Sequence, residues 1–185
     1  MENYLKGITP EILQKAKPIK LLITDVDGVL TDGGIIYDNN RIESKKFNVK
    51  DGLIVQYLKR NKIKVGVISG RNSPVVKNRC EELDFDFHFH GVQEKGLKLE
   101  GILQKMGIGF EECAFIGDDL WDLPILTRVG LSATPADALP YVKERVGFVS
   151  SLAGGKGVFR EVSDLILMAK GLLDPIVHHL SNEEL

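Results

Sequence analysis

Short apolar segments that alternate with helix-like segments constrain the fold of this 185-residue chain more than any other feature. The strand-like segments are residues 19–24, 63–68, 86–90, 113–116, 130–133 and 147–149. The helix-like segments between them are residues 53–61, 74–83, 96–106, 120–128 and 137–144. Such alternation is typical of βαβ units. It predicts an α/β fold with a doubly wound, mainly parallel, Rossmann-like sheet.

Clusters of polar residues stand where these apolar segments end. The clusters are Asp25 with Asp27, Ser69 with Gly70 and Arg71, and Asp118 with Asp119 and Asp122. A single Lys95 stands just before a helix-like segment. Ligands of open α/β sheets bind beyond the carboxyl ends of the strands. We therefore expect these clusters to meet in one site.

The first cluster, Asp25-Val26-Asp27-Gly28, has two chemical interpretations and one structural alternative. Closely packed carboxylate and carbonyl oxygens repel one another unless a hard cation such as Mg²⁺ lies between them. An aspartate can also attack phosphorus and carry an aspartyl-phosphate. Asp and Gly are common loop residues, so a polar loop after a strand is the alternative for this cluster taken alone.

Taken together, the clusters resemble the four motifs of the haloacid dehalogenase superfamily of phosphotransferases, in the same order. The resemblance implies that Asp25 is the nucleophile and that Asp27 is the general acid and then the general base. It also implies that Mg²⁺ is bound by Asp25, by the backbone carbonyl of Asp27 and by Asp118. Asp119 and Asp122 would orient the lysine or the waters on the metal, although Asp122 could be only a first-turn helix acid.

The same resemblance assigns the phosphate to a hydroxyl, backbone amides and a lysine. Ser69 and Lys95 would hold the transferring oxygens. The candidate phosphate- and substrate-binding residues are Gly28, Thr31, Ser69, Gly70, Arg71, Lys95 and Arg160.

The spaces between the motifs are too short for the cap domain that many superfamily members carry. Residues 33–47 read as a projecting β-hairpin, and residues 71–95 hold one helix and one strand. Two further stretches, Phe47-Asn48-Val49-Lys50-Asp51-Gly52 and Gly154-Gly155-Lys156-Gly157-Val158-Phe159-Arg160-Glu161, resemble the capless 3-deoxy-D-manno-octulosonate 8-phosphate phosphatases. That resemblance implies Mg²⁺-dependent hydrolysis of this sugar-acid phosphate in lipopolysaccharide biosynthesis. A nine-carbon keto-acid 9-phosphate, or a non-catalytic role as a partner of a cytidylyltransferase, stays open.

The resemblance also implies a homotetramer in which neighbouring chains complete each other's sites. The predicted hairpin carries apolar residues such as Ile36 and Ile42 on edge strands, which a monomer would expose. We expect the glycine-rich residues 154–157 to form a flexible loop that presents Arg160 to a neighbouring site. The alternative is an ordinary loop before a helix, with Arg160 as a surface charge.

Composition narrows the class of protein further. With 43% hydrophobic and 27% charged residues and a net charge of −2, the chain has no basic footprint for nucleic acid. No apolar run reaches the roughly 20 residues of a membrane helix, and residues 1–20 lack a signal-peptide pattern. We expect a cytoplasmic protein with one domain over residues 1–172 and a fraying, polar tail over residues 173–185.

A few conspicuous residues have structural interpretations. His88 and His90 alternate on a predicted edge strand, and no third metal ligand has suitable spacing in the sequence. Cys80 and Cys113 are expected in the core. Trp121 is expected to pack on the helix that follows Asp118 and Asp119, although it lies near the predicted site.

Overall fold

The computed structural model describes residues 7–181, and the expectations for residues 1–6 and 182–185 lie outside this range. Within it, parallel strands form one sheet in the order β5-β4-β1-β6-β7-β8. The strands are β1 (Leu21–Thr24), β4 (Lys64–Ile68), β5 (Phe87–Phe89), β6 (Cys113–Ile116), β7 (Leu131–Thr134) and β8 (Phe148–Val149). The predicted doubly wound α/β fold is confirmed.

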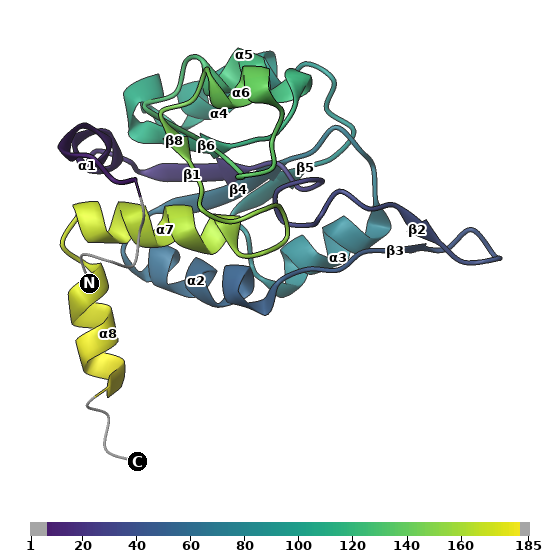
Figure 1. Ribbon diagram of the computed structural model, residues 1–185, viewed down its shortest axis with the longest axis horizontal. Coiled ribbons are helices and arrows are strands. Elements are labelled where there is room, and N and C mark those ends of the chain that lie inside the picture. Colours follow the sequence, from purple (N-terminus) through teal and green to yellow (C-terminus); the bar gives the residue numbers. More distant parts are fainter. Residues whose placement is uncertain (1–6, 182–185) are drawn as a thin grey trace.

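Helices cover both faces of this sheet (Figure 1). One face carries α2 (Val49–Arg60), α3 (Pro74–Glu82) and α7 (Val158–Ala169), and α1 (Pro10–Ala16) packs beside α7. The other face carries α4 (Lys95–Met106), α5 (Leu123–Leu126) and α6 (Pro140–Lys143). No helix in the described range has the length and apolar character needed to cross a membrane.

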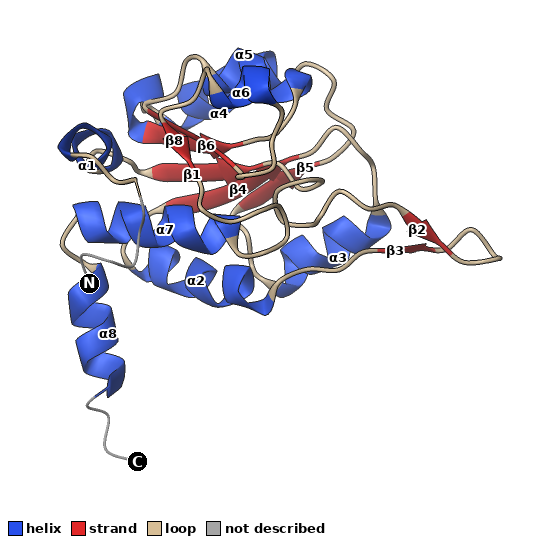
Figure 2. Cartoon of the chain, viewed as in Figure 1, coloured by secondary structure: helices blue, strands red, loops and turns tan. Residues whose placement is uncertain are grey.

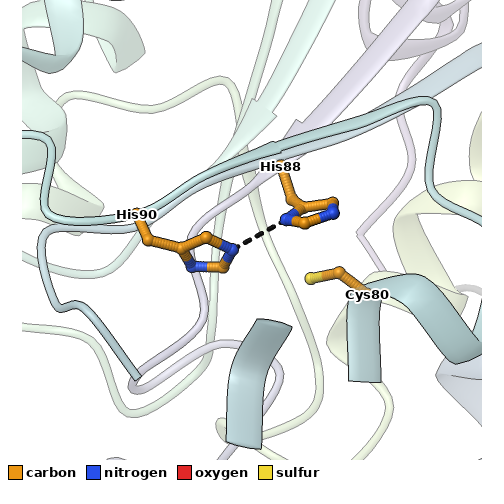
Figure 3. A group of neighbouring side chains, drawn as sticks. All are labelled: Cys80, His88 and His90. Atoms are coloured by element: carbon orange, nitrogen blue, oxygen red, sulfur yellow. Dashed lines mark hydrogen bonds between the residues drawn. The ribbon is translucent and has the colours of Figure 1, made fainter. Parts of the chain in front are cut away.

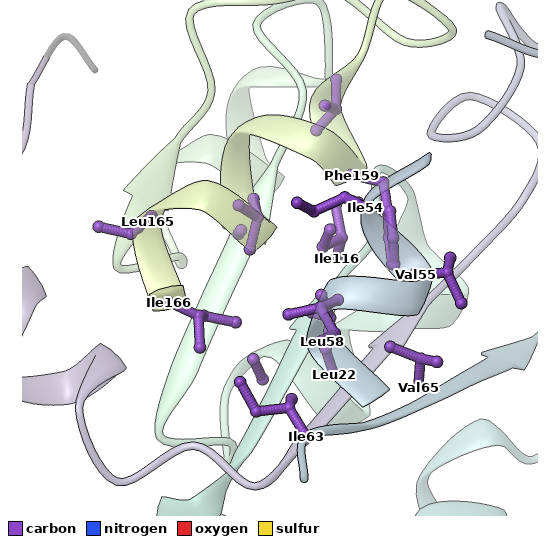
Figure 4. Close-up of a cluster of buried hydrophobic side chains, with 14 of the residues drawn as sticks. Leu22, Ile54, Val55, Leu58, Ile63, Val65, Ile116, Phe159, Leu165 and Ile166 are labelled. Atoms are coloured by element: carbon purple, nitrogen blue, oxygen red, sulfur yellow. The ribbon is translucent and has the colours of Figure 1, made fainter. Parts of the chain in front are cut away.

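Two apolar cores lie on the two faces of the sheet, and strand β1 contributes to both. Leu22 points into the core shared with α2 and α7, which Figure 4 shows with Ile54, Leu58 and Phe159. The next residue, Ile23, faces the opposite side of the sheet and belongs to the core beneath α4 and α5. Because β1 is buried on both faces, it reads as a continuous apolar run. This burial fixes the position of the acidic loop that follows it.

Helix α2 begins four residues earlier than the sequence pattern indicates. Asn48 is its N-cap, and the Asn48 side chain accepts a hydrogen bond from the Lys50 amide at 3.0 Å. The predicted helix over residues 120–128 is instead a 3₁₀ turn, Leu120–Asp122, followed by the short α5. Pro124 fixes a helical φ in the first turn of α5 and so sets its start.

The segment between β1 and α2 carries the predicted hairpin and no cap domain. Strands β2 (Ile36–Tyr37) and β3 (Glu43–Ser44) pair in antiparallel fashion and project from the body of the molecule (Figure 2). The hairpin strands are shorter than predicted. The Asp38 carboxylate accepts hydrogen bonds from the amides of Asn40 and Ile42, which closes the turn between them.

Residues 173–181, expected to be part of a polar, fraying tail, form a largely exposed helix. These residues form α8 (Leu173–Ser181), which follows α7 after a short turn (Figure 1). Leu173 is buried, and Leu172 and Ile176 pack against the core below α7. Apolar residues at helical spacing hold this helix, a pattern that the neighbouring histidines and acids obscure in the sequence.

Candidate active site

The predicted polar clusters meet at one edge of the sheet. Strand β1 lies between β4 and β6, with Thr24 paired to Val67 on one side and to Ile116 on the other. The residues that follow these three strands are therefore neighbours. They surround a cavity of about 290 Å³, lined by Asp25, Asp27, Ser69, Gly70, Arg71, Lys95, Asp118, Asp119, Trp121 and Asp122.

The loop that follows β1, called the acidic loop here, forms a tight turn closed by its own backbone hydrogen bonds. The amides of Val29, Leu30 and Thr31 all donate to the carbonyl oxygen of Val26, at 2.9–3.2 Å. Gly28 has φ +86°, and a Cβ atom there would lie 2.1 Å from the Oδ2 atom of Asp118. Only glycine combines this backbone conformation with so close an approach. Gly28 therefore allows the carboxylates from β1 and β6 to come together.

Three of the carboxylates form a cluster that suits a divalent cation. One oxygen from each of Asp25, Asp118 and Asp122 lies within 4.8 Å of the other two. The Oδ1 atom of Asp118 is buried and has no hydrogen-bond partner. Mg²⁺ binds through one or two carboxylates together with phosphate and water oxygens. Asp25 and Asp118 fit that requirement.

The raised pKa values of two of these carboxylates also favour a bound cation. Burial, followed by repulsion from Asp122, raises the pKa of Asp25 to about 7. Burial, followed by repulsion from Asp25, raises the pKa of Asp118 to about 8. Both shifts arise because negative charge is concentrated away from water. A cation held between the two carboxylates would offset this repulsion.

Lys95 and Asp122 hold the other groups of the cluster in position. The Lys95 ammonium lies 3.0 Å from Asp25 and 2.7 Å from Asp122. Burial alone would lower the pKa of Lys95, but the two carboxylates outweigh it and raise the pKa. Asp122 also accepts hydrogen bonds from the amides of Asp118 and Asp119, at 2.9 and 3.3 Å. It therefore orients both the lysine and the loop, as the resemblance implies, and is more than a helix-capping acid.

The loop after β4 supplies small polar groups to the cavity. The Ser69 amide donates to the Phe89 carbonyl oxygen at 2.9 Å, and the Ser69 hydroxyl accepts from the Arg71 amide at 3.2 Å. A Cβ on Gly70 would meet nothing closer than 3.7 Å, at the ring of Trp121. Trp121 itself is 54% exposed and lines the cavity. The interpretation of Trp121 as a packing residue is therefore wrong.

Two residues of the hairpin base reach the site and were missed in the sequence. The Lys45 ammonium is buried and forms an ion pair with Asp27, and it also lies 3.5 Å from Glu43. Glu43 in turn accepts a hydrogen bond from Arg71 at 2.8 Å. Glu43 lies in β3 and Lys45 follows directly after it, two residues further along the extended chain. The two-residue spacing of these charged side chains was the signal in the sequence that could have indicated their role.

Three of the candidate residues, Gly28, Thr31 and Arg160, do not line the cavity. Thr31 is buried, and its hydroxyl accepts the Gly33 amide at 3.2 Å, so it shapes the acidic loop. Arg160 lies in the first turn of α7, and its Nε donates to Asp164 at 2.8 Å.

The glycine-rich residues 154–157 are not the flexible loop that the sequence suggested. The Gly155 amide donates to the Val29 carbonyl oxygen at 2.9 Å. A Cβ on Gly154 would lie 2.1 Å from the Gly28 carbonyl oxygen. The glycines permit this close packing against the acidic loop of the same chain. They therefore support the acidic loop.

Known proteins match most of this chain in sequence, and solved structures match its fold. A family described as haloacid dehalogenase-like hydrolase matches residues 48–130. The 3-deoxy-D-manno-octulosonate 8-phosphate phosphatase of Salmonella typhimurium is 42% identical over 167 residues, which are 90% of this chain and 89% of that protein. The Haemophilus influenzae phosphatase is 46% identical over 158 residues, 85% of this chain and 88% of that protein. This chain belongs to the 3-deoxy-D-manno-octulosonate 8-phosphate phosphatase family.

Solved structures of this phosphatase family agree with the fold described above. The Moraxella catarrhalis phosphatase, solved with magnesium, phosphate and the sugar acid, superimposes with a TM-score of 0.91 at 38% identity. The match covers 94% of this chain and 99% of that one. A cobalt-bound phosphatase from Haemophilus influenzae matches with a TM-score of 0.83 at 46% identity, over 86% of this chain and 94% of that one.

Proposed function

We propose that this protein hydrolyses 3-deoxy-D-manno-octulosonate 8-phosphate to the free sugar acid and phosphate, in lipopolysaccharide biosynthesis. The observation that carries the proposal is the cavity in which Asp25, Asp27, Ser69, Lys95 and Asp118 converge. These are the groups that phosphoryl transfer to an aspartate needs: a nucleophile, an acid, a phosphate clamp and a metal site.

Asp25 is the nucleophile in this proposal. Its carboxylate attacks phosphorus, the bond to the sugar oxygen breaks, and an aspartyl-phosphate forms on Asp25. Lys95, 3.0 Å from that carboxylate, stays charged and holds both Asp25 and the transferring oxygens. Mg²⁺, bound by Asp25, Asp118 and the Asp27 carbonyl, supplies charge neutralisation for the phosphoryl group.

Asp27 moves the proton in both halves of the reaction. It donates a proton to the leaving sugar oxygen, then accepts one from the water that attacks the aspartyl-phosphate. Its side chain is held by Lys45 on one oxygen, and the Nε of Arg71 lies 3.7 Å from the other. The base of the hairpin therefore orients the general acid and partly covers it from water.

The sugar acid lies on the open side of the cavity, beside Gly70, Arg71, Asp119 and Trp121. Arg71 is paired with Glu43 and still 40% exposed along its side chain, so it can grip a carboxylate or hydroxyl groups. The Trp121 ring offers an apolar wall for the carbon chain. These groups favour a long, charged sugar over a small phosphate ester.

We further propose that the protein works as a homotetramer in the cytoplasm. Ile35, Ile36, Tyr37 and Ile42 on the hairpin are each more than half exposed. Pairing the hairpins around a symmetry axis would bury these residues. Arg160 would reach the substrate from a neighbouring chain. The free thiols of Cys80 and Cys113 fit a reducing compartment.

A substrate panel tests the proposed activity. We expect kcat/KM for the eight-carbon keto-acid 8-phosphate to exceed that for glucose 6-phosphate by at least about tenfold, because remote contacts serve the transition state. A nine-carbon keto-acid 9-phosphate is the discriminating competitor. Higher kcat/KM for that compound would reassign the substrate, and no turnover of any phosphate ester would overturn the enzymatic role.

A further inference from the structure

A second group of metal-binding side chains lies between α3 and the edge strand β5. His88 lies in β5, and His90 follows directly after the strand on the same face. The Cys80 side chain points toward them from α3 (Figure 3). One ligand atom from each of the three residues lies within 4.8 Å of the other two. The predicted edge-strand histidine pair is confirmed, but the fold adds the third ligand that sequence spacing did not show.

The geometry needs little adjustment to hold a tetrahedral ion. Zinc-type bonds of about 2.0–2.3 Å place neighbouring ligand atoms roughly 3.3–3.8 Å apart. The Nδ1 atom of His88 and the Nε2 atom of His90 are 2.8 Å apart, so they would separate by well under about 1 Å. Both histidines are half-buried, and Cys80 is buried beside them.

The hydrogen bond between the two rings does not satisfy the cluster. It uses the two nitrogens that would bind the ion, and the other ring nitrogen of His90, Nδ1, is buried without a hydrogen-bond partner. Burial, followed by the neighbouring His88, lowers the pKa of His90. This keeps the ring in the neutral form that binds metals. Burial raises the pKa of Cys80 to about 12, so an ion bound there has to displace the thiol proton.

We propose that Cys80, His88 and His90 form a binding site for one thiophilic divalent cation of the zinc type, separate from the Mg²⁺ site. Thiolate and imidazole ligands select such ions, whereas the oxygen ligands around Asp25 suit Mg²⁺. Binding replaces the thiol proton by a sulfur–metal bond and releases one proton to solvent. A water molecule completes the tetrahedron at the open position.

The site lies next to the loop that follows β4 and carries Ser69, and this position gives it a structural role. The end of β5 is bonded to that loop: the Ser69 amide donates to the Phe89 carbonyl oxygen at 2.9 Å, and the Val92 amide donates to the Ser69 carbonyl oxygen at 3.0 Å. An ion joining β5 to α3 therefore stiffens the strand that supports Ser69. This role acts beside the proposed phosphatase chemistry and does not depend on its substrate.

Co²⁺ is the probe that distinguishes the two sites, because only a thiolate ligand gives a sulfur-to-cobalt charge-transfer absorption. The full-length protein is reduced, saturated with Mg²⁺ and titrated with Co²⁺. We expect the charge-transfer band to appear with one Co²⁺ per chain, with release of a proton, and to disappear when one equivalent of Zn²⁺ is added. A titration without this band would overturn the proposal.

Matched variants locate the ligand atoms. Cys80→Ser should abolish the band, and His90→Gln should weaken Co²⁺ binding at least about tenfold. The control is Cys113→Ser, since Cys113 is equally buried but lies in β6, away from the histidines. A band that survives Cys80→Ser, or that is lost in a folded Cys113→Ser protein, contradicts the assignment. If Cys80→Ser does not fold, the wild-type titration and His90→Gln still decide the question.

Discussion

Asp25 is buried and lies beside a lysine and two other carboxylates. At the scale of single residues, replacing Asp25 is the most direct test of the proposed mechanism. Asp25→Asn should keep the fold and reduce kcat to background, because an amide does not attack phosphorus. Phosphate release and circular dichroism measure the two properties. Asp174→Asn, on the exposed side of α8, is the matched control and should leave kcat unchanged. Substantial turnover by Asp25→Asn, with deamidation excluded, would remove Asp25 from the role of nucleophile.

Asp118 is the residue whose loss should change the metal requirement. Asp118→Asn removes a negative charge and one anionic oxygen from the proposed Mg²⁺ ligands. We expect the Mg²⁺ concentration for half-maximal activity to rise at least about tenfold, or activity to vanish. A Mg²⁺ titration after treatment with a chelator measures this. An unchanged half-saturation value in Asp118→Asn, or a wild-type enzyme that resists chelation, would contradict the metal site.

The contact between the glycine-rich loop and the acidic loop is the decisive one at the scale of structural elements. Gly154→Ala would place a Cβ atom 2.1 Å from the Gly28 carbonyl oxygen. We expect it to lower the free energy of unfolding by at least about 1–3 kcal/mol and to reduce kcat, because the acidic loop must shift. Gly101→Ala is the matched control, since a Cβ there meets nothing within 4 Å in the middle of α4. That control should stabilise the protein by about 0.5–1 kcal/mol. Equal stability of the two variants in urea unfolding would show that the loops are not tightly packed.

The contact between α2 and α7 predicts a dependence of stability on pH. Asp51 of α2 accepts the Arg160 amide at 2.8 Å with one oxygen, and its other oxygen is buried without a partner. Burial raises the pKa of Asp51 to about 6 in the folded protein, against about 3.9 in an unfolded chain. The folded state therefore binds more protons than the unfolded state in this range. Its stability falls as pH rises from about 4 through 6, as far as Asp51 is concerned.

Asp51→Asn keeps the acceptor for the Arg160 amide and removes the buried charge. We expect the variant to be more stable than wild type by about 1–3 kcal/mol near pH 7, and by less near pH 5. Urea unfolding at both pH values measures the difference. A gain that is larger at the lower pH would mean that Asp51 is charged and stabilising in the folded protein.

At the scale of the whole molecule, the prediction concerns a site shared between chains. Asp25→Asn and Arg160→Ala subunits, each expected to be nearly inactive alone, are mixed under conditions that allow exchange. If Arg160 works from a neighbouring chain, some mixed interfaces pair an intact Asp25 with an intact Arg160, and activity returns. Native mass spectrometry follows the exchange and the number of chains. Demonstrated exchange without recovery, or a fully active monomer, would place the complete site within one chain.

The fold class and the meeting of the polar clusters in one site were predictable from the sequence alone. The alternation of apolar and helix-like segments determines a parallel sheet, because strands buried on both faces need continuous apolar runs. Carboxylates and glycine at the ends of those runs are then brought together by the topology of any such sheet. The resemblance to the superfamily motifs then allowed Asp25, Ser69, Lys95 and Asp118 to be named as candidates before their positions were known.

Only the tertiary structure decided which residues far apart in the sequence touch. Lys45 reaches Asp27 because the hairpin base folds back over the cavity, and Gly154 touches Gly28 because two loops pack without side chains between them. Cys80 meets His88 because α3 covers the edge strand. Periodicity and spacing report neighbours along one element. Contacts between elements depend on how the elements pack against each other, so they became visible only in the folded chain.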